Sequence, residues 1–323
     1  MWKSKFAVVS HPVLATLLTP LKWLRFTGPP MYMLRYEVSQ PNGEPLKYGP
    51  ALDEISRQVE KKNKGKPLFT LGEEIHARGK IGLEQIGMPA GAWWVALHVR
   101  EASYHVNDGS PRNSDPLSYM EAAQAIIDRG GYVVRIGNQG MTPIPQTEGF
   151  IDYANSNTKS DWLDIYLIGG ARFLLGSVSG PNEIARLFGV PVASANMVPM
   201  CQGPLGKNDL RIPKLMTTGS GANLLSFDEI LSSPKLRDLH TRYQFNQAQV
   251  ALQDNLPEDI RELAEEMMDR IDGTRRYDAI DDELQGKFKD LIHSQDTPET
   301  FGTAARIGSS FLSKHSHLLL NKN

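Results

Sequence analysis

The segment 92–100 reads AWWVALHVR, and this run, together with three later runs of the same kind, determines the expected fold. The later runs are YVVRIGN (132–138), RFLLGSVSG (172–180) and VPVASAN (190–196), each a short apolar stretch that ends in glycine or polar residues. Helical patterns separate them at 116–129, 161–168 and 181–188. Strands that alternate with helices over about 105 residues predict βαβ units, and therefore an α/β fold with a parallel, Rossmann-like sheet.

The composition limits the class of protein. The chain has 323 residues, of which 40% are hydrophobic and 22% charged, so it can form a real core and is neither mostly disordered nor a polytopic membrane protein. Lys and Arg number 35 against 37 Asp and Glu, and this balance predicts no nucleic-acid partner. Cys201 is the single cysteine, which excludes an intrachain disulfide and favours a cytoplasmic location.

The amino-terminal segment 6–21 is uncharged and has basic residues on both sides. It is short for a membrane span and contains two prolines, so we predict a buried strand at Phe6–Ser10 and a helix at Leu14–Phe26. A signal peptide or membrane anchor is the alternative. The basic residues Lys22 and Arg25 would then face either solvent or a membrane surface, and the second alternative corresponds to a peripheral contact with the inner membrane.

The carboxyl-terminal half is expected to be mainly helical. Residues 197–223 are rich in Pro, Gly, Ser and Thr and predict loops, and short helices are expected at 227–231 and 238–243. Longer helical patterns cover 257–270 and 277–293. The first has an apolar stripe that we expect to be buried, formed by Ile260, Leu263, Ala264, Met267, Met268 and Ile271. We divide the chain into a reduced amino-terminal α/β region (1–90), a Rossmann-like domain (91–250) and carboxyl-terminal helices that pack back across the domain boundary (251–323).

Ligands of open parallel sheets bind at the carboxyl ends of the strands, and the segment GSVSGPNEIA (176–185) follows the third strand. A Ser/Gly loop that opens a helix presents unpaired N–H groups and the positive end of the helix dipole. We therefore predict that Ser177, Ser179 and Gly180 bind a phosphate or diphosphate. The alternative is an ordinary helix start with Ser179 as the N-cap.

Two arginines lie at or just beyond the ends of apolar strands. Arg100 follows the first strand and Arg135 closes the second. A guanidinium matches phosphate oxygens in a bidentate manner, so both are predicted to bind the same phosphate or diphosphate. A salt bridge to a nearby carboxylate such as Glu101, Asp115 or Asp161 is the alternative for each.

Candidates for a general base are His98, Glu101, Asp108 and Asp115. For His98 the alternative is a hydrogen-bonded core histidine, and Asp115, directly before Pro116, is better placed as a helix N-cap. The sequence has no HExxH or DxD motif, so we predict no metal and no cofactor. Further residues at the same edge are predicted to contact the nucleotide or sugar, namely Gly137, Asn138, Asn182, Glu183 and Asn196.

These motifs are similar to those of a protein family. HVRE (98–101), RNSDPLSYMEAAQAIIDRGGYVVRIGNQG (112–140) and DYANSNTKSDWLDIYLIGGARFLLGSVSGPNEIARLFGVPV (152–192) resemble bacterial glycosyltransferases of surface-polysaccharide gene clusters. More distantly, they resemble the nucleotide-binding half of the α1,6- and peptide-O-fucosyltransferases. In those enzymes a strand ends in H-x-R and a Ser-rich loop binds phosphates, so the resemblance matches His98 and Arg100 to the H-x-R pair and Ser177–Gly180 to the loop.

The resemblance implies a GT-B architecture with two Rossmann-like domains, the amino-terminal one reduced here. It implies a nucleotide-diphosphate sugar and a glycan or lipid-linked glycan acceptor as partners, and an inverting, metal-independent transfer in polysaccharide biosynthesis. Two alternatives stay open. One is a polysaccharide pyruvyl- or phospho-transferase on a similar fold, and the other is a truncated, non-catalytic protein that binds a nucleotide sugar. The oligomeric state is not predicted.

Overall fold

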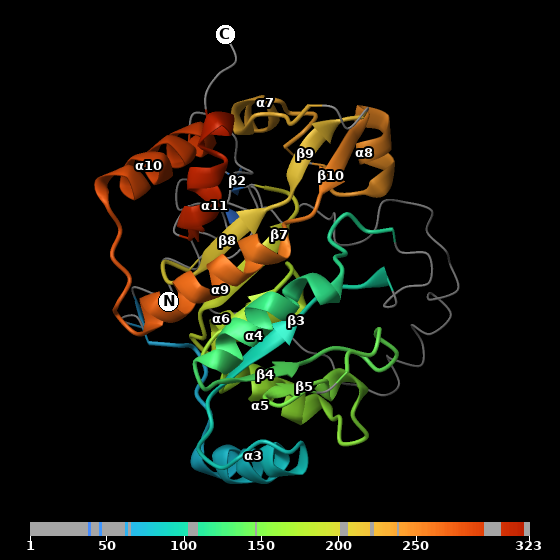
Figure 1. Cartoon of the computed structure of the whole chain (residues 1–323), viewed down its shortest axis with the longest axis vertical. Coiled ribbons are helices and arrows are strands. Elements are labelled where there is room, and N and C mark those ends of the chain that lie inside the picture. The colour runs from blue at the N-terminus through green and yellow to red at the C-terminus, as the bar shows by residue number, and fades with distance from the viewer. Residues whose placement is uncertain are drawn as a thin grey trace. The chain divides into compact units, whose positions relative to one another are not determined.

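A parallel sheet forms the centre of the fold, seen in Figure 1. The computed structural model describes residues 38–39, 45–46, 62–63, 66–102, 109–145, 147–200, 206–219, 223–237, 239–293 and 305–319. Within them, seven strands pair in parallel, and no antiparallel pair interrupts this sheet. The strands are β3 (Trp94–His98), β4 (Tyr132–Arg135), β5 (Phe150–Ile151), β6 (Leu174–Gly176), β7 (Val192–Met197), β8 (Leu210–Pro213) and β11 (Arg306–Ile307).

The order of the strands is that of a doubly wound sheet. The first strand, β3, lies inside the sheet, with β4 and β5 added on one side and β6, β7, β8 and β11 on the other. This is the strand order of Rossmann folds, and it confirms the predicted parallel α/β class. The order reverses between β3 and β6. Ligands of such sheets bind outside the carboxyl ends of the strands at this switch point.

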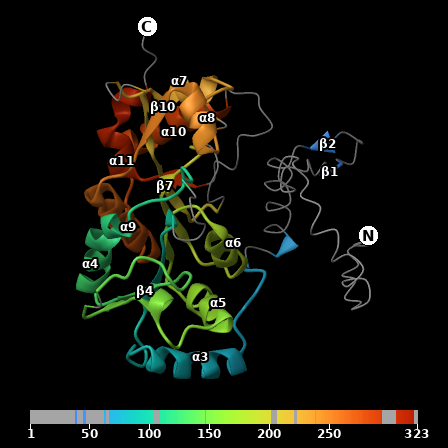
Figure 2. The same cartoon turned by 90° about the vertical axis from the view of Figure 1, so that its right-hand side faces the viewer.

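Helices cover both faces of the sheet, and Figure 2 shows α4 and α9 on one side and α5 and α6 on the other. Alternate residues of β3 supply the two cores: Val95 and Leu97 face the first layer, whereas Trp94 and Ala96 face the second. The helices are α3 (Glu73–Gln85), η4 (Pro116–Tyr119), α4 (Met120–Asp128), η5 (Tyr153–Asn155), α5 (Asp161–Gly169), α6 (Gly180–Leu187) and α9 (Pro257–Ile271).

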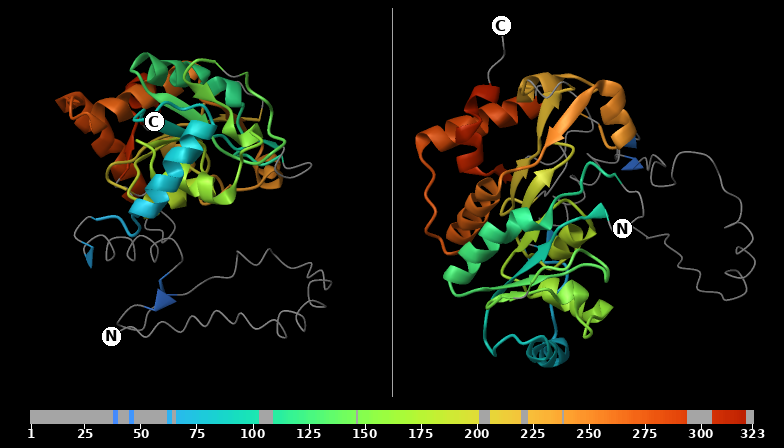
Figure 3. Two further views of the ribbon diagram at one scale, coloured as in Figure 1. Left: turned by 90° about the horizontal axis from the view of Figure 1, so that it is seen from below. Right: turned by 45° about the vertical axis from the view of Figure 1, so that its right-hand side comes forward.

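The predicted loop region after 196 contains two strands that the sequence analysis missed. β8 extends the main sheet, and β9 (Leu215–Thr218) pairs antiparallel with β10 (Val250–Gln253) in a separate ribbon. Figure 3 shows this ribbon with α8 beside it. The helix expected at 238–243 is also displaced, because α8 begins only at Arg242, where Thr241 and Gln244 form a capping box. The other elements are β1 (Val38–Ser39), β2 (Pro45–Leu46), α7 (Phe227–Ser232), α8 (Arg242–Ala248), α10 (Ala279–His293), α11 (Ser309–Lys314) and η6 (Ser316–Leu319).

The apolar stripe of α9 is buried as predicted, except at its end. Five members of the stripe belong to the core that this helix shares with α4 and the sheet, and Ile271 is 37% exposed. Residues after 250 also contribute β11 to the edge of the main sheet. The buried residues are Ile260, Leu263, Ala264, Met267 and Met268.

Part of the amino-terminal analysis concerns residues outside the described ranges, including the strand and helix expected within 6–26. Among the described residues, no helix is both long enough and apolar enough to span a bilayer.

The stripe gives a first prediction. Met267→Ala should lower the free energy of unfolding by about 2–5 kcal/mol, because the side chain is fully buried and its removal leaves a cavity. Ile271→Ala, on the same helix but partly exposed, is the matched control and should cost less than about 1 kcal/mol. Urea unfolding of both variants measures the difference. Equal losses would show that the helix does not pack on the core through this stripe.

Candidate functional site

The switch point brings the end of β3 against the end of β6. In the pairing of these strands His98 lies opposite Gly176. A Cβ atom at Gly176 would lie 1.9 Å from the carbonyl oxygen of His98, so no larger residue fits without separating the strands. Glycine therefore has a packing role here, and it lets the Ser/Gly loop start directly beside His98.

Ser177 joins the two strand ends. Its N–H donates to the carbonyl oxygen of His98 (3.1 Å), and its hydroxyl accepts from the N–H of Arg100 (2.8 Å). The side chain is fully buried. Ser177 therefore holds the backbone of the site together, and its hydroxyl is already bonded within the protein.

Ser179 is the N-cap residue of α6, as expected in the alternative interpretation, but its hydroxyl does not cap the helix. It lies instead 2.8 Å from Nδ1 of His98. Gly180, the first residue of α6, is exposed. The first turn of α6 thus keeps its positive dipole end toward solvent, beside a hydrogen-bonded hydroxyl and imidazole.

The electrostatic surroundings of His98 oppose a charged imidazole. Burial, followed by the positive charges of Arg100 and Arg135, lowers the pKa of His98 to about 4. The imidazole is therefore neutral at neutral pH and is a weak base. This result, together with the bond to Ser179, favours a role in binding over the predicted role as general base.

The structure corrects the prediction that Arg135 binds a diphosphate. Its guanidinium is fully buried and forms ion pairs with Glu101 and, at 3.0 Å, with Asp152. It also donates to the carbonyl oxygen of Thr142 (2.8 Å). A buried arginine needs such partners, because an unpaired charge in the interior is costly. Arg135 is therefore the internal ion pair of the alternative interpretation, and it does not reach a diphosphate at the surface.

Of the acidic candidates for a base, Glu101 is the partner of Arg135, and its second oxygen accepts from the N–H of Thr142 (3.0 Å). Asp115 caps η4 by accepting from the N–H of Leu117 (2.9 Å), as the preferred interpretation predicted, and it remains exposed. Asp108 lies outside the described residues. Asp115 is therefore the most accessible of the candidates that the structure describes.

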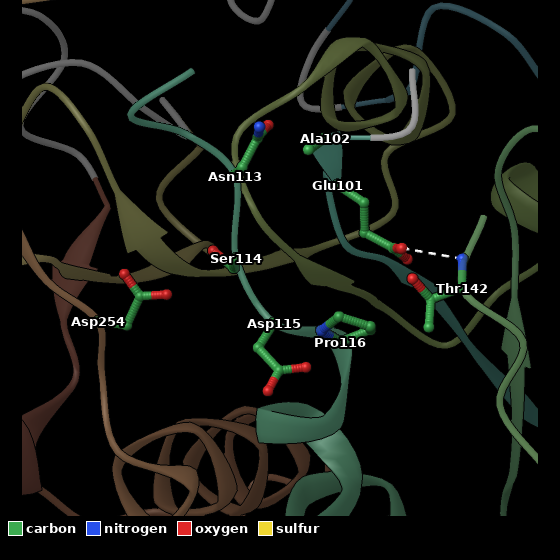
Figure 4. Close-up of a pocket in the computed structure, with 8 residues that line it drawn as sticks. All are labelled: Glu101, Ala102, Asn113, Ser114, Asp115, Pro116, Thr142 and Asp254. Carbon is green, nitrogen blue, oxygen red and sulfur yellow. Dashed lines mark hydrogen bonds between the residues drawn. The ribbon is translucent and has the colours of Figure 1, made fainter. Parts of the chain in front are cut away.

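Glu101 and Asp115 both line a pocket of about 370 Å³ at the carboxyl edge of the sheet. In Figure 4, Asn113–Pro116 run down the middle of the view, Asp254 lies on the left, and Glu101 and Thr142 lie on the right. Asp254 pairs with the buried Lys214 (2.7 Å), which also donates to the carbonyl oxygen of Asn113 (2.7 Å).

Sequence analysis did not single out Thr142, Lys214 or Asp254 as site residues. Thr142 follows the second strand at a distance of several residues, and the other two follow strands β8 and β10, which lay outside the predicted sheet. No local sequence pattern marks these three residues, because each follows at least one polar residue or proline and not an unbroken apolar run.

The residues predicted to contact the nucleotide or sugar are dispersed. Asn138 is exposed after β4, next to the partly exposed Gly137, and Glu183 points to solvent, where it pairs with Arg186. Asn182 is buried and donates to Ser194 (3.0 Å).

The structure also corrects the prediction that Asn196 contacts the nucleotide or sugar. It is buried, and its backbone N–H and side-chain oxygen both bond to Asn255 (2.6 and 2.7 Å). Its side-chain nitrogen donates to the hydroxyl of Tyr119 (3.3 Å). Asn196 thus connects β7 to the segment after β10, and its side chain does not reach a ligand at the surface.

In the part of the chain that the structure describes, no three His, Cys, Asp or Glu side chains group closely enough to hold a metal ion. The site has two chemically different parts among the described residues. One is the hydrogen-bonded pair of His98 and Ser179 at the start of α6, and the other is the pocket lined by Glu101, Asp115 and Asp254.

No protein-family model matches this sequence. No curated protein matches it either. Among solved structures, 39% of the chain is similar to 36% of a glycosyl transferase family 9 protein from Veillonella parvula DSM 2008, with a TM-score of 0.29 and 13% identity. A second match is a dodecameric iron-containing heptosyltransferase, TibC, in complex with ADP-D-beta-D-heptose. It is 14% identical, has a TM-score of 0.31, and covers 58% of this chain and 46% of that protein. The chain thus spans less than half of either protein.

The lowered pKa of His98 predicts a dependence of stability on pH. The pKa is about 4 in the folded state and about 6.5 in an unfolded chain. Between these values mainly the unfolded state binds the proton. His98 therefore does not reduce the free energy of unfolding above the unfolded pKa. As the pH falls toward 4, the free energy of unfolding decreases by about 2–3 kcal/mol.

Urea unfolding at pH 7 and near pH 4.5 tests this expectation. His98→Asn cannot be protonated, so the variant should lose less stability than the unmodified protein over the same interval. An identical loss in both proteins would mean that the imidazole is not held neutral in the folded state.

Proposed function

We propose that the chain binds a nucleotide-diphosphate sugar at the switch point between β3 and β6 and transfers the sugar to an acceptor hydroxyl. The observation that carries the proposal is the 2.8 Å contact between Ser179 Oγ and His98 Nδ1. It turns the N-cap hydroxyl away from α6 and leaves the start of this helix without that cap. A helix start of this kind, beside a hydroxyl and an imidazole that share one hydrogen bond, suits the oxygens of a diphosphate.

The proposed donor site assigns a role to each part. The N–H of Gly180 and the dipole of α6 face the diphosphate, and Ser179 and His98 supply hydrogen bonds. Arg100 belongs to the same group because it follows His98 in the H-x-R pattern of the resemblance. When the bond between sugar and diphosphate breaks, negative charge develops on the diphosphate, and these groups stabilise it.

The pocket lined by Asp115 and Asp254 is proposed to receive the acceptor side of the reaction. Its volume of about 370 Å³ lies within the usual range of small-molecule sites. Carboxylate oxygens accept hydrogen bonds from hydroxyl groups. Asp115 is the proposed general base, because its carboxylate is exposed whereas that of Glu101 is bonded to Arg135.

The finer parts of the proposal rest on the family resemblance. They are an inverting, metal-independent transfer, a glycan or lipid-linked glycan acceptor, a role in surface polysaccharide biosynthesis, and a cytoplasmic location with peripheral contact to the inner membrane. The domain division at 90 and 250 also stays a prediction. In the proposed two-domain GT-B architecture the acceptor domain would lie within 1–90, most of which lies outside the described ranges.

The donor site predicts stabilisation by a nucleotide. Among UDP, GDP, ADP and CMP, at least one should raise the melting temperature, with a gain of about 2.7 kcal/mol at 100 times its dissociation constant. Arg100→Ala should weaken this nucleotide by about 1.5–3 kcal/mol, because a charge-assisted contact is lost, and should leave the fold nearly intact. Arg100→Lys should restore only part of the affinity, because an ammonium group cannot form the bidentate contact.

Arg135→Ala is the matched comparison for Arg100→Ala. It should destabilise the protein by about 3–5 kcal/mol, because it leaves two buried carboxylates without their cation. Thermal unfolding with and without nucleotide separates the two effects. No stabilisation by any of the nucleotides at millimolar concentration would overturn the proposed donor site.

The proposed base predicts a separation of stability from turnover. Asp115→Asn retains a good N-cap residue for η4 but removes the base, so the melting temperature should hold while turnover falls by about 10²–10⁴. Asp115→Ala should lose the same turnover and, in addition, about 1 kcal/mol of stability. Release of nucleotide from the donor, with water or an added glycan as acceptor, measures turnover. Unchanged turnover in Asp115→Asn would exclude this residue as the base.

A further inference from the structure

His98 and Ser179 act as one hydrogen-bonded unit at the switch point. Their contact of 2.8 Å joins the imidazole at the end of β3 to the hydroxyl at the start of α6. The unit is firmly held, because Ser177 N–H donates to the carbonyl oxygen of His98 and Gly176 lets the two strands approach closely. The imidazole therefore has a defined position when a ligand arrives.

The number of hydrogen-bond donors that this unit presents depends on its protonation. A neutral imidazole has one N–H and the serine one O–H, and the bond between them uses one of the two. One donor of the pair is then left for another partner. After protonation the imidazole has two N–H groups, so the pair has two remaining donors and a positive charge. An anion gains from both changes.

The charges around the imidazole act in the opposite direction while no anion is bound. Burial is the largest of the effects that disfavour the imidazolium, and the charges of Arg100 on the same segment, Arg135 on β4 and Lys159 before α5 add to it. The carboxylates of Glu101 and Asp152 are bonded to Arg135. The same field disfavours a Ser–His nucleophile, because that chemistry passes through an imidazolium.

We infer that His98 takes up a proton when a diphosphate binds beside Ser179, so that donor binding and protonation of this imidazole are coupled. The negative charge of the ligand opposes the field of Arg100, Arg135 and Lys159, and its contact with the ring replaces part of the hydration that burial removes, so both effects favour the charged form. Ser179 Oγ then accepts from Nδ1–H, and its own proton turns to the ligand. The inference rests on the proposed donor site and adds a pH dependence to it.

Isothermal titration calorimetry with UDP-glucose, GDP-mannose and ADP-glucose tests the coupling. The diphosphate of these donors is a diester with no proton that titrates near neutral pH, so any proton exchanged comes from the protein. In two buffers with different heats of ionisation near pH 6, about three quarters of a proton should enter per bound ligand if the bound pKa returns to the ordinary value for histidine. The affinity should be about tenfold weaker near pH 7.5 than near pH 5.5.

Two variants assign the proton. His98→Asn keeps a side chain that can bond to Ser179 but cannot be protonated, so proton uptake should vanish and the affinity should no longer depend on pH. His76→Asn, which changes a histidine on α3, is the matched control and should retain the uptake. The ¹⁵N resonances of the imidazole of His98, followed from pH 4 to pH 8 with and without ligand, provide the same answer in the unmodified protein if His98→Asn does not fold.

The outcomes separate the inference from the proposed function. Uptake that is present in the unmodified protein and absent in His98→Asn supports the inference. Binding without uptake, or uptake that persists in His98→Asn, overturns the inference and leaves the donor site standing. If none of the three nucleotide sugars binds, the proposed function fails, and the coupling fails with it.

Discussion

The close pairing of β3 with β6 is the constraint on which the rest of the site depends. Gly176 has no Cβ, and only this absence lets the strand end pass the carbonyl oxygen of His98. The chain then turns through Ser177, whose N–H and hydroxyl bond to the backbone of His98 and Arg100. A larger residue at Gly176 would move α6 away from β3, because the helix starts only four residues later. The bond between Ser179 and His98 would then be lost.

A second polar group stabilises the same edge from the other neighbour of β3. Arg135 at the end of β4 bonds to Glu101, which follows β3, and to Asp152, which follows β5. One guanidinium thus joins the ends of three adjacent strands. Removal of one partner from such a buried group costs more than the group contributes, so the three side chains depend on one another. This arrangement holds the segment that carries His98 and Arg100 on both sides.

The sequence was sufficient to predict the four strands that consist of apolar runs bounded by glycine or polar residues. It was also sufficient to predict the position of the loop at the switch point. It was not sufficient for β8, whose residues Leu210–Pro213 include Arg211 and a proline and look like a loop. Tertiary pairing with β7 overrides this local pattern. β4 and β6 are equally short but are uninterrupted apolar runs next to glycine, and β8 lacks this signal.

The roles of single polar residues after the strands were harder to predict than the strands themselves. Arg100 and Arg135 occupy equivalent places in the sequence pattern, and both suit a phosphate. Arg135 differs because it bonds to Asp152, which lies 17 positions away in the sequence. Asn196 likewise bonds to Asn255, which lies 59 positions away. Such partners are chosen by the packing of distant segments, which no local pattern encodes. Asp115 could be predicted because its partner is two residues away.

The alternation of β3 explains how one strand can serve both an anion and a hydroxyl. Leu97 and Val99 face the layer of α4 and α9, whereas His98, between them, faces the start of α6. The proposed anion-binding groups therefore belong to one face of the sheet, whereas the pocket carboxylates Asp115 and Asp254 come from the residue before η4 and the residue after β10. A carboxylate beside the diphosphate would repel it, and a cation beside the base would weaken its attraction for a proton. Separation of the two groups across the sheet edge lets each keep the charge that its proposed task requires, and it makes a neutral His98 compatible with the cations around it until a ligand supplies the opposite charge.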